Sequence, residues 1–279
     1  MRRDRKGYTF VELVVVAVLG TLVLGAILQV LVTNQRTYTA HSATVSGQQS
    51  TRMALEVLFN ELREVSAAGG DIVAMSGDSL RVRLMRKFGA VCVTDLSLVN
   101  PVLTIVRLSN IFGMDGSNVF RAGDSVFVYA DNDEDIRTDD VWIPARVTAV
   151  DTSAVTCPQD GTPAAELTFL AQLPLFLADS VGIGAPIRSF ETYTFRTVNT
   201  LGQTYFGRRE GGGATQPVAG PIAATNGLQF IYRDDLGAVT NVPANVRQIE
   251  VRVRTGSNVL NSLGQPVRDS ITAWIFTRN

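Results

Sequence analysis

Residues 6–32 read KGYTFVELVVVAVLGTLVLGAILQVLV, an apolar stretch that follows a basic N-terminus. The run from Tyr8 to Val32 is broken only by Thr9, Glu12, Thr21 and Gln29. As a helix, these 25 residues would be roughly 38 Å long, enough to cross a hydrocarbon core of about 30 Å. Four of the first seven residues are basic and one is acidic. We therefore expect residues 8–32 to cross the cytoplasmic membrane once, with the basic end in the cytoplasm.

A cleaved secretory signal peptide is the alternative for this segment. Such a peptide has an apolar core of about 7–15 residues and ends at a site of small residues. The apolar stretch here is longer, and no Ala-x-Ala-like site closes it. The segment therefore favours a membrane anchor that remains part of the exported chain.

Glu12 is the one acidic residue in this apolar stretch. A carboxylate within a membrane is costly unless it lies near the interface or pairs with a cation. The residues alone leave both accounts open: Glu12 either faces the lipid head groups or meets a cation supplied by another molecule.

The order Lys6-Gly7-Tyr8-Thr9-Phe10-Val11-Glu12-Leu13 resembles the cleavage motif of type IV prepilins, in which Gly, an aromatic residue and a spaced Glu precede an apolar helix. The family usually has Phe where this chain has Tyr8. The resemblance implies that a prepilin peptidase removes the leader 1–7 by cutting after Gly7, and that it methylates the new amine of Tyr8. It also implies that Glu12 pairs with the Tyr8 amine of a neighbouring subunit during filament assembly, which supplies the missing cation.

We expect the helix to continue beyond the membrane and to cover residues 8–68. Residues 33–68 contain no Pro and a single Gly, Gly47. Apolar side chains recur at three- and four-residue steps, which is typical of a helix with one buried face; they are Leu55, Leu58, Phe59, Leu62 and Val65. The pair Gly69-Gly70 then predicts the end of the helix.

Residues 71–279 are expected to form a β-rich globular head, because short β-prone runs alternate there with Pro and Gly. The expected strands are 80–84, 102–106, 125–129, 145–150, 167–170, 186–198, 228–232, 249–253 and 270–277. One long helix followed by antiparallel strands is an α+β arrangement, and it matches the pilin fold, in which the helix packs on a sheet. A head of about 210 residues is larger than a minimal pilin head needs, so we expect an elaborated sheet or two sheets.

A second resemblance concerns the head. The strand–acidic loop–strand stretch 123–147, with the strands around Tyr232 and 249–253 and the terminal Arg278-Asn279, is similar to the heads of PilW-type minor pilins and J-type pseudopilins. This resemblance rests on diffuse motifs, whereas the N-terminal one rests on a spaced set of residues.

The acidic loop within that stretch has two interpretations. Asp131, Asp133 and Asp135 lie at alternate positions and Asp139 follows four residues later, a spacing that suits a hard cation such as calcium. Ile136 lies where a regular calcium loop has Gly, and Trp142 replaces its closing Glu. The loop is thus either an irregular calcium site or a solvated acidic hairpin tip.

Cys92 and Cys157 both lie in the exported part of the chain, where a disulfide can persist. We expect them to pair, closing a loop of about 66 residues that would stabilise the head by roughly 4 kcal/mol in the chain-entropy model. Two buried free thiols are the alternative.

The rest of the sequence offers no enzyme motif. His41 is the one histidine and is expected to be exposed on the helix, and the chain lacks Gly-x-Ser-x-Gly and His-Glu-x-x-His. Gly211-Gly212-Gly213 is followed by no Lys-Ser/Thr, so it indicates a flexible loop rather than a phosphate site. A net charge of −1 argues against a basic nucleic-acid footprint. We therefore expect no catalytic residue, no resident cofactor apart from the calcium alternative, and no nucleic-acid partner.

Together these features predict a minor pilin or pseudopilin that a prepilin peptidase processes. The chain would wait in the cytoplasmic membrane with its head outside, and would then enter or prime a type IV pilus or type II secretion filament with other pilins or pseudopilins as partners. Two alternatives remain: a pilin whose head is an adhesin or a DNA-uptake receptor, and an exported enzyme that uses the helix as a tether.

Overall fold

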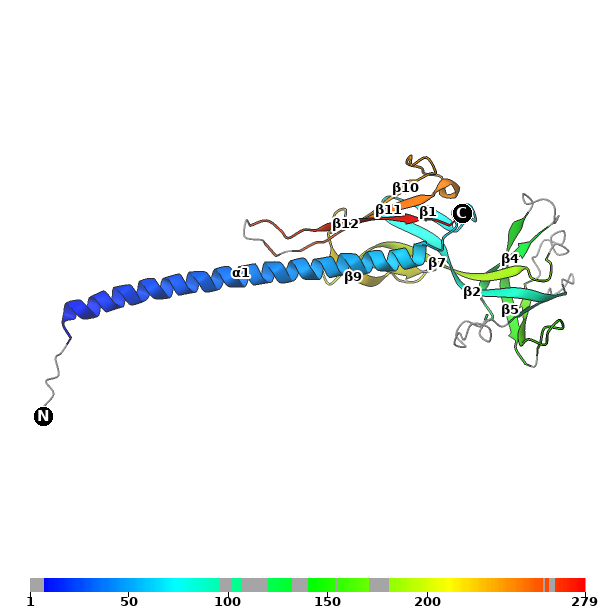
Figure 1. Cartoon of the computed structure of the whole chain (residues 1–279), viewed down its shortest axis with the longest axis horizontal. Helices are drawn as coiled ribbons and strands as arrows, with labels where there is room; N and C mark the ends of the chain where they lie inside the picture. Colours follow the sequence, from blue (N-terminus) through cyan, green and yellow to red (C-terminus); the bar gives the residue numbers. More distant parts are fainter. Residues whose placement is uncertain are drawn as a thin grey trace.

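The computed structural model describes residues 8–95, 102–106, 120–131, 140–153, 155–170, 181–257, 259–260 and 264–278. A single long helix carries a β-rich head at its C-terminal end, and the N-terminal half of the helix projects away from the head (Figure 1). This arrangement confirms the predicted α+β class and is consistent with the pilin fold.

Helix α1 spans Phe10–Leu62, 53 residues, and is therefore roughly 80 Å long. Its buried residues are all near the C-terminal end: Thr51, Ala54, Leu55, Leu58 and Leu62. These positions repeat at the predicted three- and four-residue steps and face the head, where α1 packs against β9, β11 and β12.

The predicted end of the helix was wrong by six residues, since α1 ends at Leu62 and not at residue 68. The chain leaves the helix because residues 65–71 form contacts with the head instead. Val65 and Ala67 are buried, the Arg278 amide donates to the Val65 carbonyl (2.8 Å), and the Ser66 amide donates to the Asp71 carboxylate (3.0 Å). Gly70, with a φ of 75°, forms the turn that follows.

The head contains a nine-stranded sheet, in the order β1-β2-β3-β6-β5-β4-β7-β8-β9, and a three-stranded sheet, β10-β11-β12. The strands of the larger sheet are β1 Ile72–Met75, β2 Ser79–Asp95, β3 Val102–Val106, β4 Ser125–Ala130, β5 Val141–Asp151, β6 Ala164–Phe169, β7 Pro186–Thr200, β8 Gln203–Glu210 and β9 Gln216–Ile222. The smaller sheet contains β10 Leu228–Arg233, β11 Gln248–Arg254 and β12 Ser270–Phe276, with a 3₁₀ turn, η2, at Pro243–Asn245 before β11.

Six of these strands close into a ring at the far end of the head. β2 pairs with both β3 and β7, and the path β3-β6-β5-β4-β7 returns to it through antiparallel neighbours. Closing a sheet on itself leaves these strands without an exposed edge inside the ring. We call this unit the distal barrel; β4 and β5 mark it in Figure 1.

The two long strands β2 and β7 divide the head into two cores. The distal barrel encloses one, with Val91, Leu103, Val126, Leu167 and Ile187 among its members. The other lies between α1, the first half of β2, the second half of β7 and the smaller sheet, and includes Leu58, Leu80, Phe195, Phe206 and Val251. The distal barrel is thus an insertion between β2 and β7, which accounts for the large size of the head.

Candidate functional site

Helix α1 begins with a defined cap next to the predicted processing site. Thr9 is the N-cap, in an extended conformation, and its hydroxyl accepts a hydrogen bond from the Glu12 amide (3.3 Å). The Thr-x-x-Glu spacing is that of a capping box, and a carboxylate in the first turn is also favoured by the helix dipole. We did not predict this local role for Thr9 and Glu12, although their spacing is visible in the sequence.

The N-terminal half of α1 is apolar on all sides and open on all sides. Every described residue from Tyr8 to Thr39 is exposed, and α1 is the one described helix long and apolar enough to span a membrane. Its polar hydroxyls are satisfied within the helix: Thr21 donates to the Val18 carbonyl (2.8 Å) and Thr33 to the Gln29 carbonyl (2.9 Å). A helix that is apolar all round is suited to lipid or to other helices rather than to water.

Glu12 has no cation within reach on its own helix. Between residue 8 and residue 35 the sequence contains no Lys, Arg or His, and Arg36 is 24 residues away, roughly 36 Å along the helix. Cleavage after Gly7 would remove the basic leader and create an amine at Tyr8, which would then be the one source of positive charge near the level of Glu12. Gly7 lies outside the described residues; Tyr8 and Glu12 are both exposed.

The polar middle of α1, residues 33–50, connects this segment to the head. A stripe of small residues there is half-buried on the head side, at Ala40, Ala43, Thr44 and Gly47. At Gly47 a Cβ atom would lie 2.9 Å from the Thr255 Cγ2, so the close approach of the β11–β12 connection requires glycine. One turn further along, the Ser50 hydroxyl donates to the Gly220 carbonyl (2.8 Å). These contacts hold the helix against the head before the apolar core begins.

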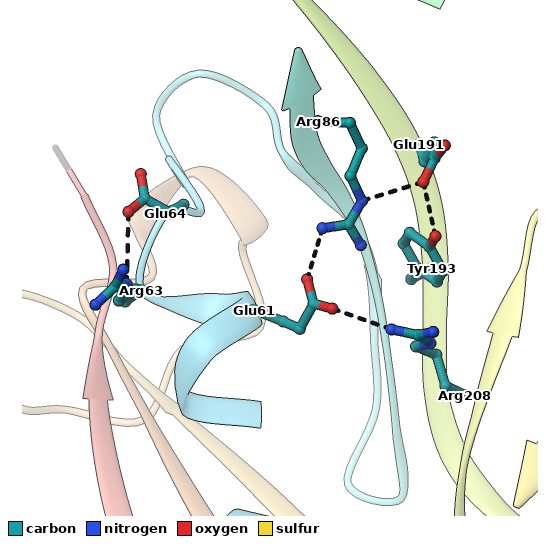
Figure 2. Close-up of polar contacts among 7 residues, drawn as sticks. All are labelled: Glu61, Arg63, Glu64, Arg86, Glu191, Tyr193 and Arg208. Atoms are coloured by element: carbon teal, nitrogen blue, oxygen red, sulfur yellow. Dashed lines mark hydrogen bonds and ion pairs between the residues drawn. The ribbon is translucent and has the colours of Figure 1, made fainter. Parts of the chain in front are cut away.

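A cluster of charged side chains fixes the last turn of α1 to the long strands (Figure 2). Glu61 accepts hydrogen bonds from Arg86 on β2 (3.0 Å) and Arg208 on β8 (3.1 Å). Arg86 also donates to Glu191 (3.1 Å), which accepts from the Tyr193 hydroxyl (2.7 Å). Both guanidinium groups lie over the Tyr193 ring, at 4.7 and 4.9 Å. Burial opposes the charge of Arg86, but its hydrogen bonds to Glu61 and Tyr193 and its attraction to them together outweigh burial, so the pKa of Arg86 is raised.

Arg86 occupies a bulge in β2, where the pairing with β7 shifts between Met85 and Lys87. A bulge bends and twists a strand. Here it falls where β2 leaves the proximal part of the sheet and enters the distal barrel, so the Glu61 cluster is placed at the joint between the helix and the barrel.

A second acidic residue, Asp71, anchors the loop that follows α1. It is 4% exposed, accepts from the Ser66 amide and lies 3.5 Å from an Arg188 nitrogen. Burial raises the pKa of the Asp71 carboxyl, against the lowering effect of the Ser66 amide and of Arg188. The Arg188 guanidinium lies over Trp142 at 4.5 Å and over Phe127 at 5.3 Å, so this carboxylate connects the helix-end loop to the outside of the barrel.

A disulfide joins Cys92 on β2 to Cys157 in the connection between β5 and β6, with their Cα atoms 5.7 Å apart. Both residues are buried and pack with Ala164. The Gln159 amide also donates to the Cys92 carbonyl (2.8 Å). The bond ties β2 to the β5–β6 connection of the distal barrel, 65 residues further along the chain.

The other residues that the sequence singled out form no common site among the described residues, or lie outside them. Asp133, Asp135 and Asp139 lie outside the described residues, so the calcium interpretation of the loop after Asp131 stays a prediction. His41 is exposed on α1, as expected. Within the described ranges, no three His, Cys, Asp or Glu side chains gather into a metal site.

Several described basic residues of the head contact its own carboxylates or hydroxyls. Arg208 pairs with Glu61, Arg209 lies 3.5 Å from the Thr194 hydroxyl, and Arg252 pairs with Glu250 at 3.2 Å. Arg233 donates to the same Glu250 at 3.0 Å.

Residues 2–28 match the family model described as the prokaryotic N-terminal methylation motif. No curated protein and no solved structure matches the chain. The matched segment covers most of the leader, Tyr8, Glu12 and most of the exposed apolar half of α1. It therefore supports a type IV pilin-like protein, and it does not extend to the head.

Proposed function

We propose that this chain is a minor pilin or pseudopilin, a structural subunit that prepilin peptidase processes and that enters or primes a filament of the type IV pilus or type II secretion kind. The observation that carries the proposal is the isolation of Glu12 on an apolar helix whose only nearby source of positive charge, once the leader is removed, would be the amine exposed by cleavage after Gly7. A membrane tether alone would need neither residue.

In this account each part of α1 has a separate task. The leader directs processing, residues 8–32 hold the chain in the cytoplasmic membrane, and the same apolar surface later packs against the helices of other subunits. Glu12 pairs with the Tyr8 amine of a neighbour, which fixes the axial position of one helix against the next. The head is displayed outside the cytoplasm, in the orientation set by the Glu61 and Asp71 contacts.

The test exchanges Glu12 in the native host. Glu12→Ala and Glu12→Gln should both leave cleavage after Gly7 intact, because the peptidase acts before assembly. Both should sharply reduce the amount of the protein in sheared filaments, or abolish priming, because neither side chain carries the negative charge that the amine requires. Glu12→Asp is the matched control and should retain part of the incorporation.

Two controls separate processing from assembly. Gly7→Val should block cleavage, so that the protein accumulates at its full length in the membrane. Thr9→Ala removes the helix cap but keeps the charge of Glu12, and should incorporate almost normally. Incorporation of Glu12→Gln at the level of the native chain would overturn the charge-pairing role, and a mature-length product from Gly7→Val would overturn the assignment of the cleavage site.

A further inference from the structure

Strand β12 leaves one edge of the smaller sheet open. In the sheet order β10-β11-β12 it is the terminal strand, and among the described residues the one backbone pairing on its far side is the bridge between Ser66 and Arg278, beyond the strand itself. Among the described parts of the chain, the edge along Ser270–Phe276 therefore has no strand paired with it.

The direction of the backbone groups on this edge follows from two hydrogen bonds. The Thr277 amide donates to the Arg247 carbonyl, on the side of β11, and the Arg278 amide donates to the Val65 carbonyl, on the opposite side. Successive residues of a strand direct their amide and carbonyl groups to opposite edges. The backbone amide and carbonyl groups of the even-numbered residues of β12 therefore point away from β11. The Ser270 amide is taken by the Asp269 carboxylate, so the open groups are those of Thr272, Trp274 and Phe276.

The other sheet edges of the described head are protected, and that of β12 is not. β1 has four residues, β9 carries Pro217 and Pro221, and β10 is hydrogen-bonded on its outer side by Gly77 and Thr240. The sequence of β12, SITAWIF, contains no charged residue, proline or glycine. Proteins normally block such an edge to prevent pairing with other chains, so an unblocked one indicates a site for pairing.

Two large aromatic side chains accompany this edge. Trp274 is 53% exposed and Phe276 is 69% exposed. Because successive side chains of a strand point to opposite faces of the sheet, these two residues lie on the same face. In strand addition the main chain supplies affinity and contacts with alternate side chains supply selectivity, and Trp274 and Phe276 are alternate side chains of β12.

The orientation of β12 relates the edge to the assembly helix. Thr255, whose amide is bonded to the Asp269 carbonyl just before β12, contacts Gly47 of α1, whereas Arg278 just after β12 is bonded to Val65. β12 therefore runs beside roughly the last four turns of α1 and in the same direction. Phe59, which lies between these two levels, is 48% exposed. A strand added to β12 would therefore run along the last turns of α1.

We propose that the outer edge of β12 binds an extended, uncharged segment from the head of a neighbouring pilin-like subunit, which becomes a fourth strand of the smaller sheet. This inference rests on the proposed function, because a filament places such heads side by side. The head of one subunit would thereby be locked to the next through main-chain hydrogen bonds, in addition to the contacts between helices.

The experiment uses the full-length protein in the membranes of its host. Both native cysteines are joined in the disulfide, so an introduced thiol is the one free thiol of the chain. Ser270→Cys at the edge would be labelled with a maleimide photocrosslinker, and Val45→Cys on the exposed side of α1 would report assembly itself. Val239→Cys, whose native side chain is 70% exposed in the connection between β10 and β11, is the control. We expect the labels at positions 270 and 45 to capture another protein that bears the N-terminal methylation motif, and the label at position 239 to capture little.

Two substitutions of Thr272 then distinguish backbone pairing from side-chain contact. Thr272→Pro removes an amide that faces the open edge and leaves the pairing with β11 intact, since proline is tolerated on an edge strand. Thr272→Val keeps that amide and removes the hydroxyl, which accepts a hydrogen bond from Arg252 (3.3 Å). Capture by the label at position 270 should fall about tenfold with Thr272→Pro, the effect of about one lost hydrogen bond, and stay near the native level with Thr272→Val. Trp274→Lys, which blocks the edge with a charge, should act like Thr272→Pro and replaces it if the proline variant is unstable.

The two positions distinguish this inference from the proposed function. Equal capture at position 270 in the Thr272→Pro, Trp274→Lys and native chains would overturn strand addition, as would an equal loss in Thr272→Pro and Thr272→Val. Capture of a pilin-like subunit at position 45 but not at position 270 would refute the edge contact and leave the proposed function standing. Failure of capture at both positions would refute the assembly role, and the edge inference with it.

Discussion

Glu61 is the residue whose removal should most weaken the hold of the head on α1, and Glu61→Gln tests this with little change in shape. The native carboxylate accepts charge-assisted hydrogen bonds from Arg86 and Arg208, each worth about 1.5–3 kcal/mol in a protected site. The amide retains one acceptor oxygen and presents an NH₂ group to the second guanidinium. One bond is therefore lost outright and the other weakened.

Two features make the expected loss of stability smaller than the sum of the two hydrogen-bond energies. Arg86 keeps its bond to Glu191, and the side chain of Arg208 is 40% exposed, so it can turn towards water. We therefore expect Glu61→Gln to lower the free energy of unfolding by about 2 kcal/mol. The control is Glu64→Gln, three residues further along, whose pairing with Arg63 is exposed on both sides at 3.5 Å. An exposed pair of this kind should cost less than about 0.5 kcal/mol.

The assay is urea unfolding of the full-length protein in detergent micelles, followed by tryptophan fluorescence. Trp142 lies on the distal barrel and Trp274 on the smaller sheet, so the two together report on both cores. An unchanged slope with a shifted midpoint would assign the effect to stability. Equal midpoints for Glu61→Gln and Glu64→Gln would contradict the reasoning, because they would mean that the Glu61 cluster contributes no more than a surface pair.

Three further predictions concern the head and its contact with α1. Replacing Cys92 and Cys157 together by Ala should lower the stability of the head by roughly 4 kcal/mol. Equal urea midpoints for this variant and for the native chain under non-reducing conditions would argue against this. Because burial raises the pKa of Asp71, its ionisation is disfavoured in the folded state. The stability of the native chain relative to Asp71→Asn should therefore fall as the pH rises from about 3.8 through the raised pKa, in parallel urea titrations; a difference that grows over this range would have the wrong sign. Gly47→Ala should gain up to about 1 kcal/mol of helix propensity in a Thr255→Ser background, and clearly less in the native one, where a Cβ would lie 2.9 Å from the Thr255 methyl; equal effects in both backgrounds would show that this approach imposes no constraint.

The parts of the fold that the sequence predicts are those governed by local pattern. The apolar run of α1, its amphipathic stripe and the β-prone runs of β4, β10 and β11 are local signals, and the structure contains the elements that they predict. The end of α1 was predicted too late because Gly69-Gly70 is the strongest local stop signal. The helix in fact ends earlier, because Val65 and Ser66 make contacts with the head and its following loop instead.

Strands β1, β8 and β9 were not predicted, for identifiable reasons. β1 is four residues long, β8 ends in the charged residues Arg208, Arg209 and Glu210, and β9 contains two prolines and a glycine. Each is weak as a local signal and forms because a neighbour supplies its hydrogen bonds. The closure of the distal barrel was equally hidden, since it depends on β2 pairing with strands on both sides, which no local pattern encodes.

Part of the candidate site could be predicted from the sequence and part could not. Tyr8 and Glu12 stand out because an aromatic residue and a carboxylate at this spacing are unusual at the start of an apolar run, and the capping box of Thr9 and Glu12 is visible in the same residues. The Glu61 cluster is not visible in the sequence, because its members come from α1, β2, β7 and β8. Acidic and basic residues on four separate elements look like ordinary surface charges until the fold brings them together.

The most direct test of the central claim is the chemical identity of the N-terminus of the protein isolated from its host membranes. Intact-mass and peptide mass spectrometry should find a chain that begins at Tyr8, seven residues shorter than the encoded sequence, with one methyl group on its amine. A chain that still begins at Met1, or one that is cut beyond residue 32 so that the apolar helix is lost, would contradict the assignment of this protein as a processed filament subunit.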